Sequence, residues 1–574
     1  MYKRFTIVSL PVCLTVVLLS FSTHDIPDNT RTNLETNIIS CAPAPGQAPD
    51  TTSNGKYISS LPGWGNHNHS ISTSNDSAQY YFNQGLSLYY SYHPKEARAS
   101  FLEASRFDST CTMAYWGEAL TLGPGYNFNH LYKLSPEIYG VLEKMNKANP
   151  NISEREKRMA AVMNLRYSAE PADRQRKKLN EDYAQGLRGL LKDFPEDPDI
   201  AALYIDAVML IHPWDFWNND GSPRPWTPEL VSLCESTMKK NPDHPAFLHY
   251  YIHLTEASAH PEVALAGATT LKQNMPGVAH MVHMASHEYE RNGLFEKGVP
   301  ANDEANAALR NYDSLASNLS LNTSSSHYLG VRAYCALSGG IYTASMPHAM
   351  ECRAAVNPSH EDTYFQYLYM FPELTQVRMG RWQDILDSSK PPEQDWAYAQ
   401  VLYHFARGMA FAGLHQLDSA KKSLSALKSF LSDPTLTVIN IPFNNTLDCA
   451  MIAEKILSGS LAFAEGKVKN GISFFEAASG IEDKLIYREP ADWMLPARQY
   501  LGAWLLKTKK NVAAEKVYRD DLLRNIGNGW SLLGLSQGLK AQGKGSEAEK
   551  FATSSATSFS GAAQLPPASA YIID

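Results

Sequence analysis

The chain contains 574 residues, of which 44% are hydrophobic and 19% are charged. That balance is typical of a folded protein and excludes an intrinsically disordered one. The formal net charge is −8, and no cluster of lysine and arginine is interleaved with aromatic residues. We therefore expect no nucleic acid among the partners of this protein.

The N-terminus has the pattern of a secretory signal peptide. Lys3 and Arg4 precede an apolar run over residues 5–19, and Ser20-Phe21-Ser22 offers a small-x-small cleavage site. No later apolar run is long enough to span a membrane. The sequence thus predicts a signal peptide at residues 1–22. It also predicts a mature chain without a transmembrane segment, exported to the periplasm, the cell surface or the medium.

A polar segment separates the signal peptide from a long helical part. Residues 23–75 are rich in Ser, Thr, Asn, Pro and Gly, which predicts a flexible linker. From residue 76 onward, apolar residues recur every three or four positions, which is typical of amphipathic helices. No sustained alternation of apolar and polar residues is present, so we expect no β-sheet.

Small residues return at fixed places along the helical part. In YYFNQGLSLYYSYHPKEARASFLEASRFD, Gly85 lies on a first predicted helix, and Ala97 and Phe101 lie on a second. Small residues let two helices approach closely, and the aromatic side chain fills the space between successive pairs. This pattern resembles the tetratricopeptide repeat (TPR), a helix-turn-helix unit of 34 residues. Further copies are centred on Gly408, Gly459, Gly502 and Ser536, with a degenerate copy at Ser286.

These copies predict an all-α fold, a TPR-like α-solenoid of stacked antiparallel helix hairpins. Residues 502 and 536 are one full period apart, which favours true repeats over chance spacing. The predicted regions are an N-terminal TPR-like helical region with a histidine-rich segment over 76–320, an irregular helical connector over 321–395, C-terminal TPR repeats over 396–560, and a tail over 561–574.

Several segments resemble a family of large bacterial secreted TPR proteins. They are GNHNHSISTSNDSAQYYFNQGL, MAYWGEALTLGPGYN, HPWDFWNNDGSPRP, NPDHPAFLHYYIHLTEAS, GVAHMVHMASHEYERNG and GNGWSLLGLSQGLKAQGK. The similarity covers about residues 64–555 and implies an architecture rather than a reaction. Members carry a Tyr-x-His-Asn-x-His-Phe segment where this chain has HYLGVRAYCALSGGIYTASMPHAM, which keeps only His327 and His348 in different positions. Any ligands that this segment supplies in relatives are therefore missing or rearranged here.

Seven of the 18 histidines lie between residues 244 and 287. Two rows of polar residues within this window have helical spacing, and a solenoid would bring their helices side by side. The first row is His249, His253 and Glu256, and the second is His280, His283 and His287. Imidazole and carboxylate ligands suit a divalent transition metal such as Zn, Cu or Fe. We treat these six residues as candidate metal ligands.

The same rows also fit a structural role, and this reading is favoured. A buried imidazole can donate to a backbone carbonyl or a tyrosine oxygen and so lock a helix pair together. The zinc-peptidase motif HExxH is absent, and so are GxSxG, a phosphate-binding loop and a Cys-His nucleophile pair. The HxH pair of His67 and His69 can chelate an ion, but its polar loop favours a structural role. The cysteines are scattered without a CxxC pair, which argues against a thiolate zinc site.

Three tryptophans, Trp214, Trp217 and Trp226, fall within HPWDFWNNDGSPRPW. Such side chains either fill the bend between two superhelical segments or offer a platform for a sugar ring or a peptide. We treat the three tryptophans as candidate ligand-binding residues, with a polysaccharide as the matching ligand.

The sequence favours binding over catalysis, and we assign no catalytic residue. The favoured function is an exported scaffold or accessory factor that holds a protein or peptide partner on its concave face, in a system for polysaccharide degradation or utilisation. Two alternatives stay open. One is a histidine-rich metal-binding protein or metalloenzyme, and the other is a carbohydrate-binding module.

Overall fold

The structure, a computed structural model, describes residues 49–127, 132–168, 173–437 and 444–572. Across these residues the protein is all-α, with 25 α-helices. The only strand-like pairing in the described part is an isolated bridge between Trp217 and Pro223. No helix among these residues is long and apolar enough to cross a membrane. The all-α fold class is confirmed, while the predicted signal peptide at residues 1–22 lies outside the described residues.

The first half of the chain forms helix pairs in chain order, and consecutive helices pack against each other. The elements are α1 (Asp76–Tyr90), α2 (Pro94–Phe107), α3 (Thr112–Leu122), α4 (Glu137–Lys147), α5 (Glu154–Leu165), α6 (Arg176–Asp193), α7 (Pro198–Ile211), α8 (Thr227–Met238), α9 (Pro245–Thr255), η3 (Pro261–Ala264), α10 (Leu265–Asn274), α11 (Ala279–Arg291), α12 (Phe295–Leu315) and η4 (Ser317–Leu319).

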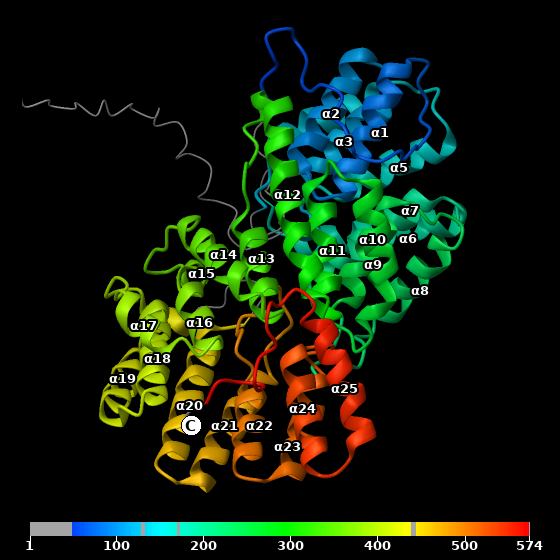
Figure 1. The fold of residues 1–574 in the computed structure, drawn as a ribbon. Coiled ribbons are helices and arrows are strands. Elements are labelled where there is room, and N and C mark those ends of the chain that lie inside the picture. The colour runs from blue at the N-terminus through cyan, green and yellow to red at the C-terminus, as the bar shows by residue number, and fades with distance from the viewer. Residues whose placement is uncertain (1–48, 128–131, 169–172, 438–443, 573–574) are drawn as a thin grey trace, which may run out of the picture.

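The second half repeats this arrangement below the first in Figure 1. The elements are α13 (Ser326–Ser338), α14 (Tyr342–Ala354), α15 (Thr363–Tyr369), α16 (Phe371–Arg378), α17 (Trp382–Ser388), α18 (Ala397–Gly413), α19 (Leu417–Phe430), η5 (Pro434–Thr437), α20 (Thr446–Ala464), α21 (Val468–Glu482), α22 (Ala497–Lys507), α23 (Asn511–Leu522), α24 (Gly529–Ala541) and α25 (Gly545–Ser558). In the figure, α12 runs beside α2 and α3, and its lower end, together with α11 and α13, lies near the lower, yellow-to-red helices.

Glycines opposite aromatic rings explain why these helices stack as repeats. The ring of Phe101 on α2 lies against Gly85 on α1, where a Cβ would lie 2.8 Å from it, and against Gly117 on α3, where a Cβ would lie 2.3 Å from it. Tyr518 on α23 is enclosed in the same way by Gly502 on α22 and a glycine on α24. Each ring thus joins its own hairpin to the next one, which is the packing of an α-solenoid. The TPR-like solenoid predicted from the repeats is confirmed.

The solenoid closes on itself where two turns meet. Gly293, between α11 and α12, has a φ of +70°, and a Cβ on it would lie 2.1 Å from the carbonyl oxygen of Gly527. Beside this contact, Nη1 of Arg291 donates to the carbonyl of Arg524 at 2.7 Å. Only glycine combines that φ with such a close approach. The contact brings the start of α24 next to the end of α11, although the two are distant in sequence.

Two segments that were not expected to pack regularly lie against the helices. Residues 49–75, part of the predicted flexible linker, bury Ile58 and Leu61, and Gln84 accepts a hydrogen bond from the backbone N–H of Leu61 at 2.9 Å. The prediction of a flexible linker was wrong for this part, because a few apolar side chains spaced through a polar run find burial on the neighbouring helices. The predicted tail also packs, since Ser569 hydrogen-bonds the hydroxyl of Tyr518 at 2.6 Å.

Candidate metal centre

The structure places the two histidine rows side by side on α9 and α11. Helix α9 begins with Pro245, and the missing N–H of proline loses no hydrogen bond there because N–H groups in the first turn have no partner within the helix. Helix α11 begins after Val278. Residues four apart on these helices share a face, so each row points at the other helix. The Nε2 atoms of His249 on α9 and His280 on α11 are 2.9 Å apart. All six residues of the two rows are at least 97% buried.

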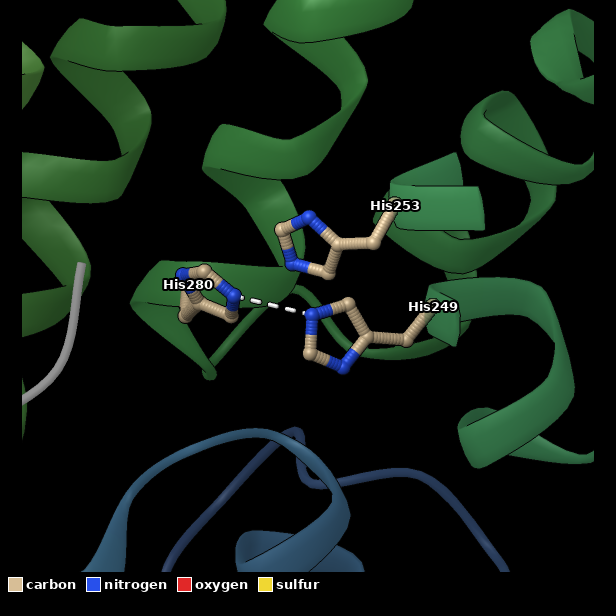
Figure 2. Close-up of side chains that lie close together, drawn as sticks. All are labelled: His249, His253 and His280. Carbon is tan, nitrogen blue, oxygen red and sulfur yellow. Dashed lines mark hydrogen bonds between the residues drawn. The ribbon is translucent and has the colours of Figure 1, made fainter. Parts of the chain in front are cut away.

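The first group of imidazoles, which we call trio A, consists of His249, His253 and His280. Each can offer one ligand atom, and these atoms lie within 4.8 Å of one another. Nδ1 of His249 lies 2.7 Å from the carbonyl oxygen of Tyr90, so Nδ1 carries the proton and Nε2 keeps its lone pair. Nε2 of His253 is buried without a hydrogen-bond partner. Figure 2 shows the three rings converging, with one ring nitrogen of His253 facing the pair formed by the other two.

The second group, trio B, consists of His283 and His287 on α11 and His327 on α13. Nε2 of His283 lies 3.0 Å from Nε2 of His327 and 2.9 Å from Nε2 of His287. Nδ1 of His283 is 2.6 Å from Oδ1 of Asn302, whose Nδ2 donates to the carbonyl of Gly298 at 2.8 Å. The amide oxygen must therefore accept from Nδ1, which leaves the Nε2 lone pair of His283 directed at its two neighbours.

Glu256 connects the two trios. Its Oε1 accepts from Nδ1 of His253 at 3.0 Å, and its Oε2 accepts from Nδ1 of His287 at 2.9 Å. Burial alone would raise the pKa of this carboxyl, but the two imidazoles outweigh burial and lower the pKa to about 2. A carboxylate on the second nitrogen is the partner that fixes the ring orientation and tautomer of metal-binding histidines.

The protonation of the imidazoles follows from burial and from nearby carboxylates. Burial is the largest cause of pKa values well below the usual range for four of them, which keeps these rings neutral at pH 7: His249, His280, His283 and His327. Burial would also lower the pKa of His287, but the carboxylates of Glu489 and Glu256 outweigh it and raise the pKa to about 9. In the absence of an ion, the short contacts between facing nitrogens are thus hydrogen bonds in which one ring donates.

Three further carboxyl groups, those of Glu288, Glu290 and Glu489, lie near His287 of trio B. Each has a buried oxygen without a hydrogen-bond partner: Oε1 of Glu288, Oε2 of Glu290 and Oε1 of Glu489. Burial raises the pKa of all three, to about 9 for Glu288 and to about 7 for Glu489. Glu489 lies 3.8 Å from Nδ1 of His287. This side of the centre is therefore rich in acidic groups that additional positive charge would stabilise.

A cavity of about 770 Å³ lies beside these acidic groups, between the two halves of the solenoid. Glu290 and Arg291 line it from α11, and Tyr487 and Arg488 line it from the loop between α21 and α22. The wall thus comes from residues next to trio B in space, while the imidazoles themselves are not part of the lining. The cavity therefore adjoins the acidic side of the centre without opening onto the imidazoles.

Two of the three candidate tryptophans line this cavity. Trp214 and Trp217 line the cavity, whereas Trp226 is not among its lining residues. Trp226 stacks on the ring of His212 with centroids 3.6 Å apart, and its Nε1 donates to the carbonyl of Asp215 at 2.7 Å. The arrangement offers a two-tryptophan wall rather than one platform of three rings.

Sequence reasoning missed His327 and Glu489 as members of the site. His327 remained in the segment where this chain departs from the family pattern, and that residual histidine was the available signal. Glu489 reaches the centre from a loop more than 200 residues after α9. Nothing in its local sequence distinguishes it from a surface carboxylate.

No family model matches the chain, and no curated protein matches it. Among solved structures, the human IFIT1 dimer with m7Gppp-AAAA is 14% identical over 84% of this chain and 90% of that chain, with a TM-score of 0.30. The APC/C hetero-tetramer Cut9-Hcn1 is 12% identical over 84% of this chain and 73% of that chain, with a TM-score of 0.28. The P58(IPK) TPR domain is 13% identical over 59% of this chain and 92% of that chain, with a TM-score of 0.17. At these values the likenesses support no argument about ligands or activity.

Proposed function

We propose that the protein binds transition-metal ions at a centre formed by trio A and trio B. One observation carries this proposal: in four of the six imidazole rings, Nδ1 forms a hydrogen bond with an oxygen atom outside the two trios. Nδ1 of His249, His253, His283 and His287 each meets an oxygen acceptor, which directs the Nε2 atoms inward. Rings held in this way direct Nε2 toward a common point, as metal-binding histidines require, and an ion bound there would displace the second proton of His287.

Each trio supplies three nitrogen ligands, which suits Zn, Cu or Fe and leaves a coordination position for water or a substrate. The trios are neighbours, because the ring centroids of His280 and His283 are 6.1 Å apart and those of His253 and His287 are 6.2 Å apart. Two ions at such a centre would share Glu256 as a common second-sphere acceptor. The neighbouring cavity is lined by Glu290 and Arg291, which follow trio B residue His287 on α11, so it would bring a small molecule near trio B but not into contact with its imidazoles.

Metal content of the mature protein and of two paired variants tests this proposal. His253→Gln with His280→Gln removes two ligands of trio A, and His283→Gln with His287→Gln removes two ligands of trio B. We expect each pair to lose one equivalent of metal relative to the wild type, measured by elemental analysis after loading and desalting. Glutamine keeps a polar side chain of similar size, and circular dichroism checks that the helices persist.

His260→Gln is the matched control, because His260 is exposed and pairs only with a surface glutamate. This variant should bind as much metal as the wild type. Unchanged metal content in both paired variants, with the helical fold retained, would refute the proposal.

A protein-binding scaffold is the second candidate function, and the confirmed solenoid favours it because stacked hairpins present extended surfaces for partners. The signal-peptide pattern at residues 1–22 supports export to the periplasm, the cell surface or the medium. The resemblance to large bacterial secreted TPR proteins supports the same setting. The wall formed by Trp214 and Trp217 supports contact with a sugar ring, in line with a role in polysaccharide utilisation.

Two measurements address this second candidate. Capture of one defined protein by the mature chain from the native envelope fraction, lost at high salt or on a surface variant, would support the scaffold. Titration with oligosaccharides, followed by tryptophan fluorescence, would test the cavity wall. We expect Trp217→Ala to weaken any such signal strongly and Trp226→Ala to leave it unchanged, since Trp217 lines the cavity beside Trp214 and Trp226 does not line it.

A further inference from the structure

A second group of histidines surrounds Asp199, away from both trios. His67 and His69 come from the extended segment before α1, Asp199 lies in the first turn of α7, and His244 immediately precedes α9. Nε2 of His67 lies 2.9 Å from Oδ1 of Asp199, and Nδ1 of His69 lies 2.6 Å from Oδ2. The four side chains are at least 92% buried. Three separate elements therefore meet at one carboxylate.

His244 is the part of this group that hydrogen bonding does not explain. Both of its ring nitrogens are buried without a hydrogen-bond partner, and its Nε2 lies 3.4 Å from Oδ1 of Asp199. Burial of a polar atom without a hydrogen-bond partner lowers the stability of the folded state. The ring of His244 contains two such atoms. The contacts with Asp199 engage one ring nitrogen of His67 and one of His69. They leave both ring nitrogens of His244 without a hydrogen bond.

We propose that His67, His244 and Asp199 bind one divalent transition-metal ion. Their ligand atoms lie within 4.8 Å of one another, and two imidazoles with one carboxylate form a ligand set that such ions favour. His69 holds the other carboxylate oxygen, and the hydroxyl of Tyr90 donates to Oδ1 of Asp199 at 2.8 Å, so the carboxylate is oriented from two sides. This site uses none of the residues of trio A or trio B, and it does not depend on the proposed function.

The ion would fasten the N-terminal segment to α7 and to the start of α9, the helix that carries the first histidine row. His67 and His69 lie in residues 49–75, while His244 marks the start of the helix that carries His249 and His253. Tyr90 links this site to trio A, because its hydroxyl binds Asp199 and its backbone carbonyl accepts from His249 at 2.7 Å. Occupation of the Asp199 site thus stabilises an acceptor that orients a ring of trio A.

Metal counting with site-specific variants tests the inference. The mature protein is stripped with a chelator, reloaded with Zn²⁺ or Co²⁺, desalted and analysed for bound metal. We expect His67→Ala with His244→Phe to lose one equivalent while the paired variants of trio A and trio B each lose a different equivalent. Phenylalanine at 244 keeps a ring against Phe247, whose centroid lies 4.8 Å from that of His244. Asp199→Asn, which retains the size of the side chain, should lose the same equivalent.

Limited proteolysis provides a second readout. Zn²⁺ should slow cleavage within residues 49–75 of the wild type and have no such effect on the His67→Ala, His244→Phe variant. Metal content equal to that of the wild type in this folded variant would overturn the inference. If only the trio variants lose metal, the Asp199 site fails and the proposed function stands. If only the Asp199 variants lose metal, the proposed function fails and this site stands.

Discussion

At the scale of single residues, Glu256 orients one imidazole ring in each trio. Its two oxygens accept from His253 and His287, one from each trio. A glutamine at this position can accept from only one ring, because its NH₂ group faces the N–H of the other. We expect Glu256→Gln to weaken metal binding by about 10–100-fold, as loss of an outer-sphere partner does. Titration against a competing chelator measures this change.

Glu262→Gln is the control for loss of a carboxylate, because Glu262 is exposed and lies beside exposed His260. It should leave the affinity unchanged. A different result for Glu256→Gln, the complete loss of one ion at saturating metal, would show that Glu256 is itself a ligand. His253, Glu256 and His287 are close enough to form such a set, with their ligand atoms within 4.8 Å of one another.

The sequence predicted the two rows because helical spacing alone puts residues four apart on one face. It could not predict the third member of trio B, because His327 joins through the packing of α13 against α11 and α12. It also could not reveal that Asn302 fixes the tautomer of His283, since an asparagine on α12 has many other roles. Rows of histidines on one helix can therefore be predicted from the sequence, whereas partners from other helices require the tertiary structure.

At the scale of helices, the glycines that receive aromatic rings should tolerate no larger residue. A Cβ at Gly117 would lie 2.3 Å from the ring of Phe101, which is held on its other side by Gly85. We expect Gly117→Ala to destabilise the fold by about 1–3 kcal/mol, because the ring must move in a packed interface. Urea or thermal unfolding, monitored by circular dichroism, measures the loss.

Gly140→Ala is the matched control on a neighbouring helix. Gly140 lies within α4, and no atom lies within 4 Å of a Cβ placed there. Alanine favours the helix over glycine by about 1 kcal/mol, so this variant should be slightly more stable than the wild type. Equal loss of stability in both variants would mean that the ring contacts do not hold the repeats together.

The repeat signal in the sequence reported these same contacts, since it consisted of glycines and aromatics at set distances. Composition, in contrast, gave a wrong prediction for residues 49–75, which it assigned to a flexible linker. Ile58, Leu61, Trp64 and Ile71 are spread through that polar run without helical or strand periodicity, yet each is buried. An extended segment that packs on a solenoid leaves no periodic trace, so composition alone misjudges it.

At the scale of the whole molecule, bound ions should contribute to stability. Any ligand that binds only the folded chain stabilises it, by about 2.7 kcal/mol at a free concentration 100 times its dissociation constant. Removal of metal also leaves acidic groups near trio B without added positive charge. We expect chelation to lower the melting temperature and re-addition of metal to restore it, followed by scanning calorimetry. Identical melting curves with and without chelator would contradict this expectation.

The contact between Gly293 and Gly527 should govern how tightly the two halves close. Alanine at 293 adds a Cβ that would lie 2.1 Å from the carbonyl of Gly527, in addition to the strain of a positive φ. Gly543→Ala is the matched control, because Gly543 has a φ of +79° but no atom within 4 Å of its Cβ position. We expect Gly293→Ala to release bound metal to a chelator faster than Gly543→Ala, by stopped-flow absorbance. Equal release rates in the two variants would contradict this prediction and show that the contact between Gly293 and Gly527 does not affect how long the protein retains metal.

The order in which the chain is synthesised gives this closure a further meaning. Every imidazole of both trios has been made once α13 is complete, whereas Glu489 and Gly527 emerge much later. During that interval a partly made chain can present its nitrogens to ions in the surrounding solution, without the wall that later covers them. The segment that places Glu489 3.8 Å from His287 is thus made after all six imidazoles, so the acidic side of the centre is the last part of it to be completed.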